Sequence, residues 1–312
     1  MCTKRKWGLT LTSSLPIGVE LYDSSEAEDG QLILSVSGGP KSGKTFLSTH
    51  VDRPLYYLML DPHDNVRRAL RHADEDGYTG PVYLKTIRPV RDDDLTDDKA
   101  QKSLDEIEDF ASWARTEARK AKAAGLPTGT FVLDRAKRLK GYVEKAKLDQ
   151  RITLGWRPTK GGSSISRFEY AEANTYIVDF LAAFLGSPLD VIMTTEGQRK
   201  WVGNDRTEEF RSGSIDNLGF VVHAEVVTLM DKEAIIVDQR VQGYRSVPKV
   251  RIVFNDAQPY LNDRVMKAQS FNKLKELFGI TNPVEAEDRL DPSDAKHEPA
   301  LVDPFGVKDD DE

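Results

Sequence analysis

The stretch from Gln31 to Thr45, QLILSVSGGPKSGKT, decides the fold that we predict for this chain of 312 residues. Its first part is a short apolar run, which is typical of a buried strand. Its second part matches the spacing G-x-x-x-x-G-K-[ST], with Gly38, Gly43, Lys44 and Thr45 at the four specified positions. The residues that follow, TFLSTHV, favour the start of a helix. Strand, glycine-rich turn and helix in this order are the structural context that the motif requires.

The residue types of this loop suit a phosphate group. Glycines let successive backbone N–H groups turn inward around an anion, and the following helix presents its positive end to the same anion. Lys44 is expected to reach the β- and γ-phosphates, and the Thr45 hydroxyl to bind Mg²⁺. The alternative is a glycine-rich surface turn. We predict a site for ATP with magnesium, formed by Gly38, Gly39, Pro40, Lys41, Ser42, Gly43, Lys44 and Thr45.

Strand-like and helical segments alternate after this loop. The predicted strands are 54–61, 82–87, 130–134 and 190–195, and the predicted helices are 65–73, 99–124, 135–147 and 167–185. Alternation of this kind favours an α/β fold, with a mostly parallel sheet and helices on both faces. Beyond Leu218, strand-like runs at 220–229, 234–239 and 249–255 predict an antiparallel extension of that sheet, followed by a short helix at 271–278.

Composition divides the chain into an N-terminal extension (1–29), one nucleotide-binding domain (30–282) and a disordered acidic tail (283–312). The tail holds eleven acidic and three basic residues, a net charge of −8, whereas the whole chain carries −7. The body is therefore close to neutral, and its average charge neither supports nor excludes a nucleic-acid partner. The tail is a candidate contact for replication proteins, with an inert solubilising segment as the alternative.

Two further observations limit the class of protein. No run approaches the ~20 apolar residues that cross a bilayer, and the N-terminal residues are too polar for a secretory signal. The one cysteine, Cys2, allows no internal disulfide and no cysteine-rich zinc site. We predict a cytoplasmic protein without a membrane partner.

A carboxylate on the magnesium side of the site is expected at the end of a strand near the phosphate loop. Asp134, which closes TFVLD, is the predicted metal ligand, and its alternative role is that of a helix N-cap. Asp61, which closes PLYYLMLD, is the competing candidate. Both could line the site, because ligands bind at the carboxyl ends of parallel strands.

The run GGPKSGKT, the strands ending in Asp61 and Asp134, and the later strand DVIMTTEGQ together resemble the RecA-type core. In particular they resemble the phage-encoded RecA-like ATPases associated with single-strand annealing and recombination. The resemblance covers about residues 31–255. It implies that Gly38–Thr45 is the Walker A element, that Asp134 is the Walker B carboxylate, and that Gln198 senses the γ-phosphate.

The chain departs from this pattern where RecA-type proteins place the glutamate that activates the attacking water. The sequence here is Asp61-Pro-His-Asp64, with His63 near the expected position. Asp61 or Asp64 could take that role, or hydrolysis could be slow. Arg135 also stands where a small hydroxyl residue is more usual. The catalytic candidates are Lys44, Asp61, His63, Asp64 and Gln198.

The resemblance also implies two loops that bind single-stranded DNA. The first, 151–166, contains Arg151, Trp156, Arg157 and Lys160, and the second contains Arg199, Lys200 and Trp201. Cations pair with phosphates and aromatic rings stack on bases, so both segments suit a single strand. In the alternative, each Trp covers a core edge and the cations are solvated. Some arginines could instead reach the γ-phosphate of a neighbouring subunit in a homo-oligomer.

The leading prediction is an ATP-hydrolysing RecA-like protein that acts on single-stranded DNA in phage-type recombination or replication. A small-molecule (nucleotide) kinase is the first alternative, because nucleotide kinases share the opening Gly-Gly-Pro-x-x-Gly-Lys. A non-hydrolysing nucleotide switch is the second, because the position of His63 departs from the pattern of active enzymes.

Overall fold

The computed structural model describes residues 30–60, 65–88, 99–154, 167–202, 205–211, 221–237, 240–255, 265–267 and 271–278. Eight strands form one sheet in the order β10-β9-β8-β1-β5-β4-β2-β3, and β6 pairs with β7 in a separate hairpin. The strands are β1 (Ile33–Gly38), β2 (Leu55–Met59), β3 (Val82–Thr86), β4 (Thr130–Asp134), β5 (Asp190–Thr194), β6 (Gln198–Val202), β7 (Asp205–Arg211), β8 (Ala224–Val237), β9 (Arg240–Asn255) and β10 (Val265–Lys267). The helices are α1 (Lys44–Thr49), α2 (Asn65–Glu75), α3 (Lys99–Ala123), α4 (Ala136–Thr153), α5 (Arg167–Ala182) and α6 (Phe271–Leu277).

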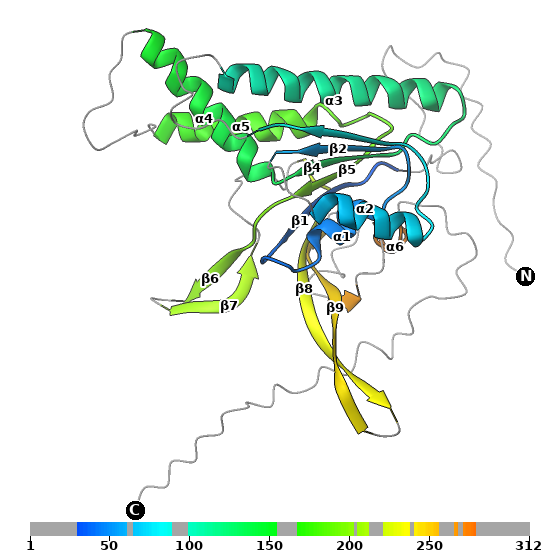
Figure 1. Ribbon diagram of the computed structural model, residues 1–312. Helices are drawn as coiled ribbons and strands as arrows, with labels where there is room; N and C mark the ends of the chain where they lie inside the picture. Colours follow the sequence, from blue (N-terminus) through cyan, green and yellow to red (C-terminus); the bar gives the residue numbers. More distant parts are fainter. Residues whose placement is uncertain are drawn as a thin grey trace, which may run out of the picture.

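The sheet is mostly parallel, as predicted. Each neighbouring pair from β8 through β1, β5, β4 and β2 to β3 is parallel, and β9 and β10 add antiparallel pairings at one edge. Strands β1, β2, β4 and β5 are buried along their whole length. They read as continuous apolar runs in the sequence because helices cover both of their faces. These features confirm the predicted α/β fold with helices on both faces (Figure 1).

Two hydrophobic clusters lie on opposite faces of this sheet. One packs α3, α4 and α5 against Phe131, Leu133, Val191 and Met193. The other packs α1, α2 and α6 against Leu34, Val36, Val132 and Ile192. Successive residues of a strand point to opposite faces, so the two clusters divide the apolar side chains of each strand between them. Among the described helices, none has the length and apolar character needed to cross a bilayer.

The last strands differ from the prediction in two ways. Strand β8 is continuous from Ala224 to Val237, although separate strands were expected at 220–229 and 234–239. The charged run Asp231-Lys232-Glu233 lies between the two expected strands, and its cross-strand pairing with β9 is continuous. In addition, β8 is parallel to β1, and only β9 begins the antiparallel part of the extension.

Parts of the two segments that were predicted as loops are regular at the backbone level. Helix α4 extends to Thr153, so Arg151 lies in a helix and not in a loop. The sequence offers no helix breaker before Gly155, which explains the extra turn. Strands β6 and β7, at 198–202 and 205–211, pair with each other, and the sequence between them, Gly203-Asn204, is one that favours hairpins. The boundaries predicted at 29/30 and 282/283 adjoin residues outside the described ranges and stay predictions.

A buried ion pair anchors α6 to the sheet. Asp190 at the start of β5 accepts a hydrogen bond from Lys275 Nζ at 2.8 Å through Oδ2, and from the Leu32 backbone N–H at 2.8 Å through Oδ1. Both charged side chains are about nine-tenths buried. Burial raises the pKa of the Asp190 carboxyl, and the Lys275 ammonium opposes that rise. The carboxylate therefore depends on Lys275 for its charge compensation.

We expect Lys275→Met to lower the free energy of unfolding by about 3 kcal/mol, because it leaves a buried carboxylate without its cation. Urea denaturation measures the change. Lys273→Met on the same helix, where the side chain is about half exposed, is the matched control and should be close to neutral. Adding Asp190→Asn to Lys275→Met should recover part of the loss. Equal effects of the two lysine substitutions would contradict the anchoring role.

Candidate functional site

The glycine-rich loop follows β1 at the carboxyl edge of the sheet and leads into α1. Gly38, the last residue of β1, has φ of +153°, and Gly43, which precedes α1, has φ of +98°. A Cβ atom on Gly38 would lie 2.4 Å from Thr228 Oγ1 and 2.7 Å from the Thr228 carbonyl oxygen. Side chains cannot occupy that space, so the first glycine of the motif is required by the packing of β8 as well as by its backbone conformation.

The Lys44 side chain folds back onto the loop. Its Nζ donates to the carbonyl oxygens of Gly38 at 2.8 Å and Gly39 at 2.7 Å. Burial lowers the pKa of the Lys44 ammonium; the Glu196 and Asp134 carboxylates act to raise that pKa, and Arg135 acts to lower it. The ammonium is thus held inside the loop, among two carboxylates and a second cation.

Strand β8 braces the loop from one side. Thr228 Oγ1 donates to the Ser37 carbonyl oxygen at 3.1 Å and lies 2.6 Å from Ser42 Oγ. Because the Thr228 hydroxyl has only one hydrogen, Ser42 is the donor of the second bond. No sequence signal indicated Thr228, a single hydroxyl residue between Val227 and Leu229 of β8.

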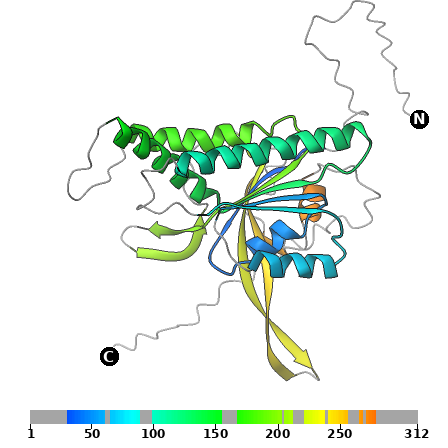
Figure 2. The ribbon, with the colours of Figure 1, turned by 45° about the horizontal axis from the view of Figure 1, so that its top comes forward.

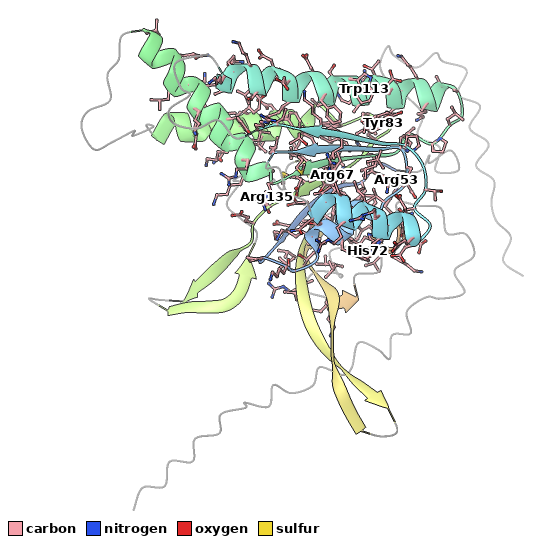
Figure 3. The ribbon with its side chains drawn as sticks, viewed as in Figure 1. Arg53, Arg67, His72, Tyr83, Trp113 and Arg135 are labelled. Carbon is pink, nitrogen blue, oxygen red and sulfur yellow. The ribbon has the colours of Figure 1, made fainter. Side chains whose placement is uncertain are left out.

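Asp134 ends β4 and is almost fully buried. Its Oδ1 accepts a hydrogen bond from Thr194 Oγ1 at 2.6 Å, and Thr194 Oγ1 in turn accepts one from the Arg135 backbone N–H at 2.8 Å. Arg135 adopts a left-handed conformation with φ of +61°. Such a conformation is costly for a non-glycine residue and is typical of functional sites. Figure 3 shows Arg135 at the edge of the sheet that carries the phosphate loop, and Arg53 at the opposite edge.

The end of β5 brings Asp134 and the loop together, because β5 lies between β1 and β4. Beyond the strand, the Thr195 backbone N–H donates to the Val36 carbonyl oxygen at 2.8 Å, and that of Gly197 donates to the Gly38 carbonyl oxygen at 2.9 Å. A Cβ on Gly197 would lie 3.0 Å from three backbone atoms of Gly38. Thr194 and Glu196 were not predicted as site residues, although polar residues at the end of a buried strand were a usable signal.

The chemistry of these residues fits a magnesium ion. Mg²⁺ prefers oxygen ligands and is usually bound by one or two carboxylates together with substrate phosphates and water. Asp134 supplies a carboxylate, and the half-buried Thr45 supplies a hydroxyl at the start of α1. No cluster of three or more His, Cys, Asp or Glu residues that could hold a metal occurs within the described ranges.

The other predicted site residues divide into two groups. Gln198 starts β6 directly after Gly197, and β6 continues through Arg199, Lys200 and Trp201, so their backbones follow the segment that contacts the loop. The residues that lie outside the described ranges are Asp61, His63, Asp64, Trp156, Arg157 and Lys160.

Two ribbons project from the same edge of the sheet (Figures 1 and 2). The β6–β7 hairpin follows β5, and β7 contacts β1. Strand β8 pairs with β1 only as far as Thr228, and its remaining residues pair with β9. At 3.3 Å per residue, the β8–β9 ribbon extends ~30 Å beyond Thr228. The loop from Gly38 to Thr45 therefore lies between the bases of two projecting ribbons.

No protein-family model matches the chain, and no curated protein gives a significant match. Among solved structures, the chain is similar to a KaiC-like protein from the archaeon Pyrococcus horikoshii, with 11% identity over 72% of this chain and 89% of that one and a TM-score of 0.30. It is also similar to an ATPase of a bacterial type III secretion system, with 10% identity over 64% of this chain and 53% of that one and a TM-score of 0.35.

We expect Thr194→Val to lower the free energy of unfolding by about 1–3 kcal/mol, because it removes the donor to buried Asp134 and the acceptor of the Arg135 N–H. It should also raise the Mg²⁺ concentration needed for half-maximal ATP binding. Urea denaturation and a magnesium titration with a fluorescent ATP analogue measure the two effects.

Thr195→Val is the matched control, since the buried Thr195 hydroxyl has no hydrogen-bond partner within the described structure. We expect it to leave both measurements nearly unchanged. If the two valine variants behave alike, Thr194 does not position Asp134.

Proposed function

We propose that this protein is a RecA-like ATPase that binds ATP with magnesium and hydrolyses it. The observation that supports this most strongly is the junction of three strand ends. The phosphate loop follows β1, Asp134 ends β4, and β5 between them is hydrogen bonded to both through Thr195, Gly197 and Thr194. A phosphate-binding loop beside a buried carboxylate is the arrangement that phosphoryl transfer from a nucleotide requires.

The roles of the residues follow from their chemistry. Backbone N–H groups of the loop cradle the phosphates, and Lys44 exchanges the carbonyl oxygens of Gly38 and Gly39 for phosphate oxygens. Thr45 and Asp134 hold the magnesium ion, which neutralises negative charge on the phosphates. Gln198, at the start of β6, is the proposed sensor of the γ-phosphate.

ATP hydrolysis by the wild type in the presence of Mg²⁺, compared with Lys44→Ala, tests the proposal. We expect Lys44→Ala to reduce turnover by about 100-fold or more, because it removes a cation aimed at the charge that develops in the transition state. Lys120→Ala, at an exposed position on α3, should retain wild-type turnover.

The alternatives are outcomes of the same assay. Phosphate transfer to a nucleoside monophosphate, without release of inorganic phosphate, would replace the ATPase with a nucleotide kinase. Tight ATP binding with no turnover under any condition would replace it with a non-hydrolysing switch.

We further propose single-stranded DNA as the partner, in phage-type recombination or replication. The support is the position of the β6–β7 hairpin, which begins one residue after Gly197 and carries Arg199, Lys200 and Trp201 along β6. Cations and a stackable ring on a segment joined to the phosphate site would let DNA binding and ATP turnover influence each other. A homo-oligomer and a role of the acidic tail 283–312 in contacting replication proteins stay predictions.

We expect Trp201→Ala to weaken the binding of a labelled single-stranded oligonucleotide by about tenfold, because it removes one stacking platform. Arg199→Ala should reduce the dependence of log K on log salt concentration by about 0.7, the value for one phosphate contact. Fluorescence anisotropy over a salt series measures both, with Lys120→Ala as the control. Unchanged binding in both variants, or turnover that does not respond to DNA, would remove the DNA proposal and leave the ATPase proposal in place.

A further inference from the structure

The segment after β5 holds an acidic residue that the roles above do not use. Glu196 lies between Thr195 and Gly197, whose backbone N–H groups donate to Val36 and Gly38 of β1 at 2.8 and 2.9 Å. Hydrogen bonds on both sides fix the backbone of Glu196 along the end of the strand that carries the phosphate loop. The Glu196 side chain is exposed, so water can reach it.

One carbonyl connects this segment to the catalytic lysine. The Gly38 carbonyl oxygen accepts from the Gly197 backbone N–H at 2.9 Å and from Lys44 Nζ at 2.8 Å. The peptide that joins Glu196 to Gly197 therefore lies next to the Lys44 ammonium.

This arrangement defines a position for the terminal phosphate of a bound nucleotide. Lys44 of such a loop reaches the β- and γ-phosphates, and Asp134 marks the magnesium side. Asp134 is buried and already accepts from Thr194, whereas Glu196 is exposed at the neighbouring strand end. Of these two carboxylates, Glu196 is the one that solvent water can approach beside the phosphate group.

We propose that Glu196 is the carboxylate that orients and deprotonates the water that attacks the γ-phosphate. The inference rests on the ATPase function proposed above and assigns its general base. It moves that role from the segment Asp61–Asp64 at the end of β2 to the end of β5. Gly197 supports the role, because its lack of a Cβ allows the segment to approach Gly38 closely.

The step balances as a displacement at phosphorus. The water oxygen forms a bond to the γ-phosphorus, the bond from that phosphorus to the β–γ bridging oxygen breaks, and ADP leaves with the electron pair. Glu196 takes one proton from the water and passes it to solvent after phosphate is released. No oxidant or reductant is needed. General-base assistance of this kind contributes roughly 100- to 10,000-fold to a rate.

Glu196→Gln is the first test, because it keeps the size of the side chain and removes its basicity. We expect kcat to fall by at least about 100-fold while the affinity for a fluorescent ATP analogue stays within about twofold of the wild type. Glu75→Gln, at an exposed position on α2, is the control and should retain wild-type kcat. A wild-type kcat in Glu196→Gln would overturn the inference. If only the affinity for the ATP analogue changed, Glu196 would be a counter-ion of Lys44 and not a general base.

Chemical rescue provides a readout that a structural role would not move. Glu196→Ala should regain part of its turnover on addition of formate, which can enter the vacated space and accept the proton. Asp61→Asn and Asp64→Asn are tested in parallel. If either variant lost more kcat than Glu196→Gln, the general base would belong to the segment after β2 and not to Glu196. A wild type that binds ATP but never cleaves it would instead remove the ATPase proposal itself, so the two failures are distinguishable.

Discussion

The insertion of β5 between β1 and β4 is the constraint on which the candidate site depends. The phosphate loop belongs to β1 and the buried carboxylate belongs to β4, and these strands share no hydrogen bonds. Strand β5 and the residues that follow it connect the two through backbone N–H groups and through one side-chain hydroxyl. Their backbone continues along β1 to Gly38, and the Thr194 hydroxyl holds Asp134. The geometry of the site is therefore set by a strand that contributes neither the loop nor the proposed metal ligand.

The loop itself is confined by backbone on two sides. Thr228 of β8 lies against Gly38 on one side, too close for a Cβ atom on that glycine, and on the other side a Cβ on Gly197 would lie 3.0 Å from the Gly38 backbone. These contacts preform the loop before any nucleotide arrives, and Lys44 occupies its interior by binding two of its own carbonyl oxygens. Binding of an anion then exchanges one set of hydrogen bonds for another, so little backbone rearrangement is required.

Local patterns predicted the central fold well, because buried parallel strands are short apolar runs and the motif places the loop between a strand and a helix. Asp134 was identified for the same reason, as a charge at the end of such a run. What the patterns could not provide was strand order. Nothing local shows that Glu196 lies beside Lys44 or that Thr228 braces Ser42, since these pairs are separated by more than 150 residues. The strands predicted for the β8–β9 ribbon were too short, since charged residues interrupt its apolar runs.

The pairing of β1 has a consequence for how the chain folds. Its two neighbours in the sheet, β5 and β8, come from sequence far downstream, with hydrogen-bonded residues 158 and 191 positions apart. Contacts of such high sequence separation must overcome the entropy of closing a long loop, and they slow folding. During synthesis, the phosphate loop lacks β5 until Thr194 has left the ribosome, and it lacks β8 until Thr228 has followed. The glycine-rich loop is thus encoded near the start of the described chain but is among the last parts of the central sheet to reach its final structure.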